Sequence, residues 1–191
     1  MTRRLDEIVV IDVESTCWPG EPPPGQESEI IEIGVCLLNV QSLRREQKRS
    51  ILVRPRHSTV SHFCTRLTTL TAEQVAAGVS FAEACATLQE EYDTRSRAWA
   101  SYGNYDRRQF RHQCQENDVP YPFSPSHVNV KNLIALALGC EREPSLVEAF
   151  DLLGWSLEGT YHRGDDDAWN IARLLSALLR HGRELNSPET S

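Results

Sequence analysis

The sequence lacks several features that would place it in specialised classes of protein. No apolar run reaches the roughly 18 residues needed to span a bilayer, and residues 1–7 lack the apolar stretch of a signal peptide. Low-complexity stretches and internal repeats are absent. The six cysteines form no Cys-x-x-Cys pair, which favours reduced thiols over a zinc knuckle. We therefore expect a cytoplasmic globular protein that does not associate with membranes.

Basic charge is also scarce. The chain has 20 Lys and Arg against 27 Asp and Glu, a formal net charge of −7, which argues against a protein that coats long nucleic acid through a general basic surface. Acidic charge still permits a phosphate site, because a carboxylate cluster that binds divalent cations attracts phosphate once the metals are bound. The length of 191 residues predicts one domain over residues 1–183, followed by a flexible tail over residues 184–191.

Hydrophobic periodicity predicts an α/β fold. Apolar segments predict strands over residues 8–13, 29–39, 51–54, 98–102 and 127–130, with a polar link over residues 41–49. Helical faces and capping residues predict helices at residues 71–74, 80–91, 106–117, 132–138, 145–153 and 165–179, with Gly154 and Gly182 as stops. The first three strands are expected to form an antiparallel meander. The result is a mixed five-stranded sheet flanked by helices, as in ribonuclease H-like folds.

Two acids stand at the end of the first predicted strand. Asp12 and Glu14 are two residues apart, so their side chains should lie on the same side of the sheet. A carboxylate that follows a run of Ile and Val is costly unless its charge is stabilised, and a divalent cation would do so. Taken alone, the pair is more typical of a solvated strand end than of a functional site.

Further acids and a histidine occur at the starts of two predicted helices. Asp106 follows the fourth strand and has an alternative interpretation as an ordinary helix N-cap. Asp167 is the third of three consecutive aspartates that helix capping and the helix dipole also explain. Neither explanation accounts for His162, which we expect to be an exposed loop residue five positions before Asp167.

The coincidence of these five residues at one edge of the predicted sheet indicates a metal-dependent site. Four crowded carboxylates repel one another, and two Mg²⁺ or Mn²⁺ ions roughly 3.5–4 Å apart would compensate them while clamping the oxygens of a phosphodiester. A histidine with an ordinary pKa near 6.5 can accept a proton from the attacking water at neutral pH.

These motifs resemble those of the DEDDh, or DnaQ-like, 3′→5′ exonucleases, and within them the Eri-type exoribonucleases and the KapD-like bacterial proteins. The likeness covers nearly the whole chain. Its three motifs are Ile11-Asp12-Val13-Glu14-Ser15-Thr16-Cys17, then Asn104-Tyr105-Asp106-Arg107-Arg108-Gln109-Phe110, and His162 four intervening residues before Asp167. Residues 29–34 and 67–71 also resemble intermediate signatures of this family.

The resemblance implies roles for individual residues. Asp12, Glu14, Asp106 and Asp167 would hold two divalent cations, Mg²⁺ or Mn²⁺, and His162 would activate water. It also implies that Thr16 and Leu70 contact the terminal nucleotide. We add Arg163 as a candidate phosphate contact, although a single arginine is more typical of a solvated surface. Ser15 and Thr69 depart from the Ala and Gly common at these positions, so the resemblance does not define the shape of the nucleotide pocket.

The predicted function is removal of 5′-mononucleotides from single-stranded 3′ ends, with RNA favoured over DNA through the resemblance. Two alternatives stay open, a DNA proofreading or repair exonuclease and a catalytically weak module that binds RNA ends. Targeting would require a protein partner. Arg107, Arg108 and Arg111 share one predicted helix and are individually more typical of a solvated face.

Overall fold

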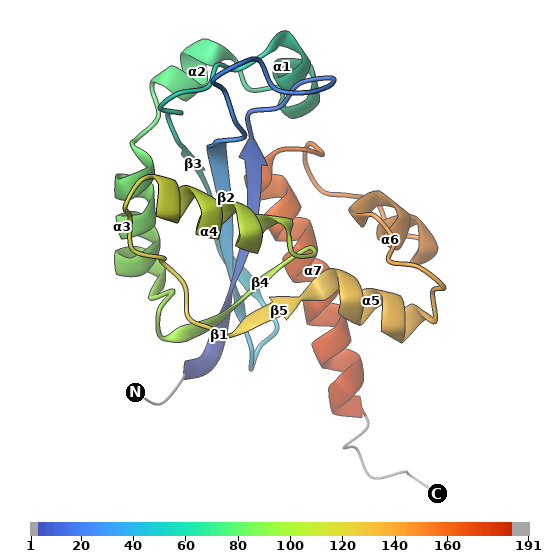
Figure 1. The fold of residues 1–191 in the computed structure, drawn as a ribbon. Helices are drawn as coiled ribbons and strands as arrows, with labels where there is room; N and C mark the ends of the chain where they lie inside the picture. Colours follow the sequence, from blue (N-terminus) through green and yellow to red (C-terminus); the bar gives the residue numbers. More distant parts are fainter. Residues whose placement is uncertain (1–3, 185–191) are drawn as a thin grey trace, which may run out of the picture.

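The computed structural model describes residues 4–184 (Figure 1), so residues 185–191 of the predicted tail lie outside the described residues. Five strands form one sheet in the order β3-β2-β1-β4-β5. Their bounds are β1 (Arg4–Ser15), β2 (Ile30–Asn39), β3 (Arg45–Leu52), β4 (Arg97–Ser101) and β5 (His127–Asn129). Strands β1 to β3 pair antiparallel, whereas β4 is parallel to β1 and to β5. The predicted mixed sheet and its antiparallel meander are confirmed.

The third strand begins earlier than predicted. Strand β3 covers Arg45–Leu52, so the polar link predicted over residues 41–49 is wrong in its second half, and the strand predicted over residues 51–54 ends at Leu52. The physical reason is its position at the sheet edge. Four of its eight residues are exposed and only one is buried, so the apolar pattern that reveals a buried strand is missing.

Seven helices lie in the described part of the chain. They are α1 (His62–Thr68), α2 (Ala72–Ala76), α3 (Phe81–Tyr92), α4 (Tyr105–Glu116), α5 (Val130–Leu138), α6 (Leu146–Leu152) and α7 (Gly164–Glu184). Capping boxes at Thr71, Ser80 and Ser145 begin α2, α3 and α6, as those sequence segments predict. In residues 4–184 no helix is long and apolar enough to cross a membrane.

The helices differ from the predicted ones in two places, a short helix that was not predicted and a predicted helix end. Helix α1 was not predicted, because only two of its seven residues are buried and its apolar pattern is weak. Helix α7 continues through Gly182 to Glu184, so the predicted stop is wrong. A glycine ends a helix when its backbone turns left-handed, as Gly154 does after α6 with φ +66°, and Gly182 has no such conformation.

The sheet separates two cores and orients the residues of β1. Alternate residues Val9, Ile11 and Val13 pack toward α3 and α4, whereas Ile8 and Val10 pack with α5, α6 and α7. Asp12 and Glu14 continue the second series at the carboxyl end of the strand. Both acids therefore lie on the same side of the sheet, as predicted, and this is the side that α7 covers.

Candidate active site

A cleft of about 360 Å³ opens at the carboxyl ends of β1 and β4. The five residues predicted to act together, Asp12, Glu14, Asp106, His162 and Asp167, all line it. They come from the end of β1, the first turn of α4, the loop before α7 and the first turn of α7. Parallel strands β1 and β4 bring the first two of these elements to the same edge of the sheet.

Two glycines bring the start of α7 against the sheet. A Cβ built on Gly34 of β2 would lie 1.8 Å from the carbonyl carbon of Gly164, the first residue of α7. A Cβ on Gly164 would in turn lie 2.9 Å from the backbone nitrogen of Gly34. The helix and the strand thus touch backbone to backbone, as only glycines allow. This contact places Asp167, three residues into the helix, beside Asp12.

Asp106 is buried and turned toward β1. Its Oδ1 accepts a hydrogen bond of 3.0 Å from the backbone N–H of Val13, between the two acids of that strand. The N-cap of α4 is Asn104, so the interpretation of Asp106 as an ordinary N-cap is wrong. Burial raises the pKa of Asp106 to about 6, even though the bond from Val13 favours its charged form.

Asp167 carries an oxygen without a partner. Its Oδ2 accepts a hydrogen bond of 2.9 Å from the backbone N–H of His162, but its buried Oδ1 has no hydrogen-bond partner in the described structure. Burial raises the pKa of Asp167 to about 7, and burial together with Asp106 and Asp167 raises the pKa of Asp12. Buried acids with an unsatisfied oxygen need positive charge, so the residues fit a divalent cation.

His162 lies in a strained loop beside these acids. Its φ is +64°, a left-handed conformation that is uncommon for residues other than glycine. Its Nδ1 lies 3.8 Å from Oε1 of Glu14, whose charge raises the pKa of the imidazole, and the side chain is one-third exposed rather than fully exposed. Potential ligand atoms of Glu14, His162 and Asp167 lie within 4.8 Å of one another.

Arg163, predicted as a phosphate contact, is not among the residues that line the cleft and instead pairs with an acid. Its guanidinium pairs at 2.9 Å with Glu32, a carboxylate of β2 with no exposed surface that also accepts from the N–H of Gly164 at 2.8 Å. A buried carboxylate without an opposite charge is strongly destabilising, and Arg163 supplies that charge to Glu32. Sequence reasoning missed Glu32, because nothing local marks a strand acid as the partner of a residue 131 positions away.

We predict that Arg163→Met lowers the free energy of unfolding by about 2–3 kcal/mol, because it leaves Glu32 buried with only neutral hydrogen-bond donors. Denaturant titration measures the loss. The double variant Glu32→Gln/Arg163→Met should regain most of the stability, since no uncompensated charge remains. If Arg163→Met lost activity but kept full stability, that result would instead support the predicted phosphate contact.

The predicted nucleotide contacts Thr16 and Leu70 are also buried, with 1% of each residue exposed. The hydroxyl of Thr16 is buried, donates to the carbonyl of Glu27 and accepts from the N–H of Glu29, so it fixes the entry into β2. Leu70 packs in a small core with Ile31 and Cys64. Neither side chain lines the cleft. Its remaining lining residues are Val13, Ser15, Cys17, Leu67, Tyr102, Tyr105, Lys131, Ser145, Leu146 and Tyr161.

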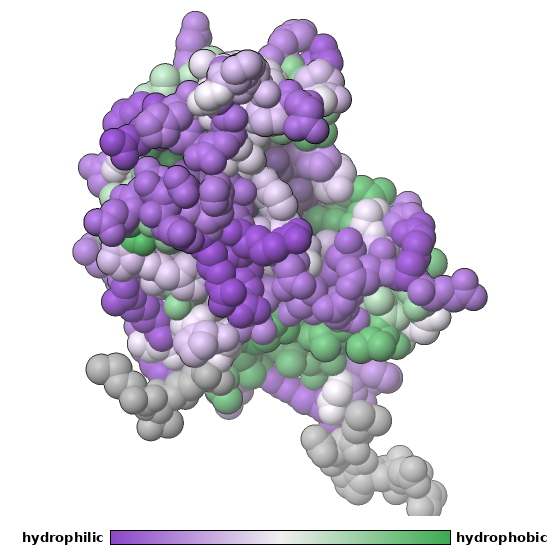
Figure 2. Space-filling model, in the orientation of Figure 1, coloured by the Kyte–Doolittle hydropathy of each residue, from purple (hydrophilic) through white to green (hydrophobic). Residues whose placement is uncertain are grey.

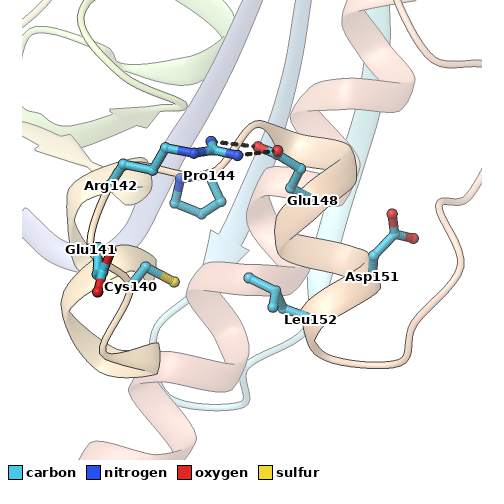
Figure 3. Close-up of a pocket in the computed structure, with 7 residues that line it drawn as sticks. All are labelled: Cys140, Glu141, Arg142, Pro144, Glu148, Asp151 and Leu152. Atoms are coloured by element: carbon cyan, nitrogen blue, oxygen red, sulfur yellow. Dashed lines mark hydrogen bonds and ion pairs between the residues drawn. The ribbon is translucent and has the colours of Figure 1, made fainter.

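A larger hollow of about 750 Å³ lies between the end of α5 and α6, and none of the five predicted site residues lines it (Figure 3). Cys140 and Leu152 face its interior, and Arg142 pairs with Glu148 across one side. Its acids come from one face of α6 and from a turn, and Glu148 also completes the capping box of that helix. Arg142 and Glu148 neutralise each other, and Glu141 and Asp151 are exposed, so the hollow lacks the buried, convergent acids of the cleft.

A model of the RNase_T exonuclease family matches residues 9–175. The chain belongs to this family. It is 32% identical to 3′-5′ exoribonuclease 1 of Homo sapiens over 96% of this chain and 55% of that protein. It is 26% identical to the probable 3′-5′ exonuclease KapD of Bacillus subtilis, over 96% of this chain and 90% of the relative.

A solved structure supports the same family. The nuclease domain of 3′hExo, a DEDDh family member bound to rAMP, superposes with a TM-score of 0.85 at 29% identity, over 95% of this chain and 96% of that chain. The fold is therefore the ribonuclease H-like fold of DEDDh exonucleases, as predicted. These enzymes are metal-dependent hydrolases. The chain spans about half the length of the exoribonuclease 1 relatives that it matches.

Proposed function

We propose that this chain is a metal-dependent 3′→5′ exonuclease that releases 5′-mononucleotides from single-stranded 3′ ends, RNA more readily than DNA. One observation carries the proposal, the convergence of four buried or half-buried acids and His162 in one cleft, with an unpartnered oxygen on Asp167. The family membership supports hydrolysis. The human relative is named an exoribonuclease, which supports RNA as the favoured substrate.

In the proposed mechanism Asp12, Glu14, Asp106 and Asp167 hold two divalent cations, Mg²⁺ or Mn²⁺. When bound, these ions supply the positive charge that stabilises the attacking and leaving oxygens of the phosphodiester. His162 lies at the open side of the acid cluster, one-third exposed, and accepts the proton of the attacking water. Glu14 stabilises the imidazolium that results, because its carboxylate is 3.8 Å from Nδ1.

The other cleft residues form the proposed nucleotide pocket in place of Thr16 and Leu70. Leu67 is 37% exposed and Tyr105 is 46% exposed, so each presents apolar surface on which a splayed terminal base can pack. Lys131 supplies an ammonium for a phosphate and is weakly paired with Glu143 at 3.8 Å. Single strands are favoured because unstacking a terminal base costs a few kcal/mol in a duplex and little in a flexible tail.

The proposal is tested with three 5′-labelled strands: RNA, DNA of matching sequence, and the same RNA ending in a 3′-phosphate. With Mg²⁺ or Mn²⁺ we expect a ladder that shortens from the 3′ end, fastest for RNA and strongly slowed by the 3′-phosphate. Excess chelator should stop it. Cuts in a circular strand would contradict an end-dependent pocket, and turnover in chelator would contradict the metal mechanism. Binding without turnover would favour the alternative of an RNA-end-binding module.

We predict that His162→Asn lowers kcat by about 100-fold, because general-base catalysis contributes about 10²–10⁴-fold. The wild-type rate should fall as the pH decreases through the pKa of His162, which Glu14 raises above 6.5, since the protonated ring cannot accept a proton. The variant should lose this acid limb, which a pH-rate profile measures. A variant that keeps the wild-type profile would remove His162 from the role of base.

Cytoplasmic location, a targeting partner and the choice between Mg²⁺ and Mn²⁺ remain predictions from the sequence. DNA repair or proofreading is the second candidate, and the ratio of RNA to DNA turnover in the three-strand experiment distinguishes it.

A further inference from the structure

The acids of the cleft create a problem for a polyanionic substrate. Four carboxylates surround the reacting position, and the whole chain carries a net charge of −7. Bound cations neutralise the site itself, but the strand that leads into it also needs favourable contacts. Lys131 is the only lysine or arginine that lines the cleft within residues 4–184. A positive surface next to the cleft would therefore decide how firmly a long strand is held.

Helix α4 provides such a surface. It begins at Tyr105, a residue of the cleft, and carries Arg107, Arg108 and Arg111 over the next turn and a half, about 9 Å along its axis. Arg107 and Arg111 are four residues apart and so lie on one side of the helix. Arg108 and Arg111 are exposed and Arg107 is half-buried. In Figure 2 mostly hydrophilic residues lie where Figure 1 places α4.

These three arginines lie within five residues of one another on α4 and have no acidic partners in the described part of the chain. Among residues 4–184, none of their side chains makes an ion pair or a hydrogen bond. Arg44, Arg95 and Arg180 are also exposed and unpaired, but they are far apart in the sequence, whereas the three arginines of α4 lie together. Like charges four residues apart on a helix repel each other, which lowers the stability of the helix. Contact with solvent alone does not require three arginines, because neutral polar residues would be solvated without this repulsion. The cluster is therefore suited to an anion with several charges.

The groups around the cluster favour nucleic acid. The guanidinium of Arg111 lies 5.8 Å from the centre of the Tyr121 ring, and both Arg107 and Arg111 lower the pKa of nearby His127, which burial brings to about 4. The ring of His127 packs against Trp99 at 4.3 Å. Neutral His127 adds no charge, so the surface consists of guanidinium groups beside an aromatic ring, the combination that binds single strands with little sequence preference.

We propose that Arg107, Arg108 and Arg111 of α4 bind the backbone phosphates of the single strand that lies upstream of the 3′-terminal nucleotide. We call these three residues the α4 arginine surface. The inference rests on the proposed function, because the position of the 3′ end is set by the cleft. The α4 arginine surface would supply affinity for long strands and leave the chemical step unchanged. A guanidinium can form two parallel hydrogen bonds with a phosphate, so each arginine can hold one phosphate.

The test compares the triple variant Arg107→Gln/Arg108→Gln/Arg111→Gln with the control Arg44→Gln/Arg95→Gln/Arg180→Gln. The control removes the same charge from exposed arginines that do not line the cleft. The substrates are a dinucleotide and a strand of about 12 nucleotides, within the range bound by single-strand modules. The Kd of the long strand is also measured in Ca²⁺ by fluorescence anisotropy at several salt concentrations.

For the long strand we expect the α4 variant to raise KM and Kd at least tenfold without changing kcat. The slope of log affinity against log salt should fall by about 2, since each lost phosphate contact on a single strand contributes about 0.7. Dinucleotide turnover and the control variant should match wild type within twofold. Arg108→Gln alone, which changes one exposed residue, should show a smaller effect in the same direction if the triple variant fails to fold.

Equal Kd values and salt slopes for the α4 and control variants would overturn the inference while leaving the proposed function intact. Loss of dinucleotide turnover in a folded α4 variant would also overturn it, because the arginines would then serve the reaction itself. Failure of the wild-type protein to cleave either substrate would instead count against the proposed function. In that case the salt dependence of Kd still decides whether the surface binds a strand.

Discussion

Asp167→Asn should lower exonuclease activity at least 1,000-fold while making the metal-free protein more stable at pH 8. Activity falls because an amide cannot replace a charged ligand, and a metal ion contributes several kcal/mol to the transition state, where each 1.4 kcal/mol is a factor of ten. The fold should be preserved, because the amide oxygen can still accept the N–H of His162 that Oδ2 accepts at 2.9 Å.

The gain in stability follows from the pKa of Asp167, which burial raises from 3.8 to about 7. A raised carboxyl pKa means that the folded protein binds the proton more tightly than the unfolded chain does. Its contribution to stability is therefore present below pH 3.8 and is lost as the pH rises to about 7. At pH 8 the wild-type folded state carries a buried, uncompensated charge that costs on the order of a few kcal/mol, and Asn removes it.

Thermal melting in chelator measures this effect. We expect the melting temperature of Asp167→Asn to exceed that of wild type by about 5 °C or more at pH 8, and the difference to shrink toward pH 4. Added Mn²⁺ should stabilise wild type and not the variant. The control is Asp165→Asn, which makes the same change two residues earlier at a carboxylate 3.5 Å from Lys48, and should keep its activity. A less stable Asp167→Asn protein at pH 8 would mean that the acid cluster carries no net repulsion.

The sequence allowed prediction of the elements that hold the acids because their signals are local. A period of two assigns Asp12 and Glu14 to one side of β1, and a polar residue after a strand and before a helix marks the position of Asp106. The order of strands and helices then brings these ends to one edge of the sheet. The structure accordingly brings together the five residues that the motifs select.

Positions that depend on distant partners were predicted less well. The sequence alone could not show that Arg163 pairs with Glu32, because Glu32 lies on a strand far away in the sequence. Thr16 and Leu70 occupy motif positions that suggest substrate contact. In the structure the hydroxyl of Thr16 hydrogen-bonds to backbone groups, and Leu70 packs in a small core. Tyr105 and Leu67 stand in motifs that assign them no role, and Lys131 stands in none, so only the fold places these three side chains in the cleft.

Gly34→Ala should reduce both stability and activity strongly, although backbone propensity alone predicts the opposite. Gly34 has no left-handed φ, and replacing glycine by alanine inside a strand would ordinarily gain roughly 0.5–1 kcal/mol. The added Cβ, however, would lie 1.8 Å from the carbonyl carbon of Gly164 and 2.3 Å from the amide nitrogen of Asp165. Both atoms belong to backbone, so β2 and the start of α7 must separate.

Separation of β2 and α7 should move Asp167 away from Asp12 and Glu14. A misplacement of about 1 Å in an active site can cost about 100-fold in rate, and overpacking a core typically costs about 1–3 kcal/mol. We therefore expect Gly34→Ala to lose at least 100-fold in kcat/KM, to bind Mn²⁺ more weakly by calorimetry, and to unfold at lower denaturant concentration than wild type.

A graded series of alanine substitutions isolates the steric cause. Gly182→Ala lies in the same helix, and its Cβ would meet nothing within 4 Å, so it should match wild type in activity and be slightly more stable. Gly164→Ala, whose Cβ would come within 2.9 Å of the Gly34 nitrogen, should fall between Gly182→Ala and Gly34→Ala in both properties. If Gly34→Ala kept wild-type activity and Mn²⁺ affinity, the contact between the backbones of β2 and α7 would not be what positions Asp167, and its placement would have to depend on the Arg163–Glu32 pair alone.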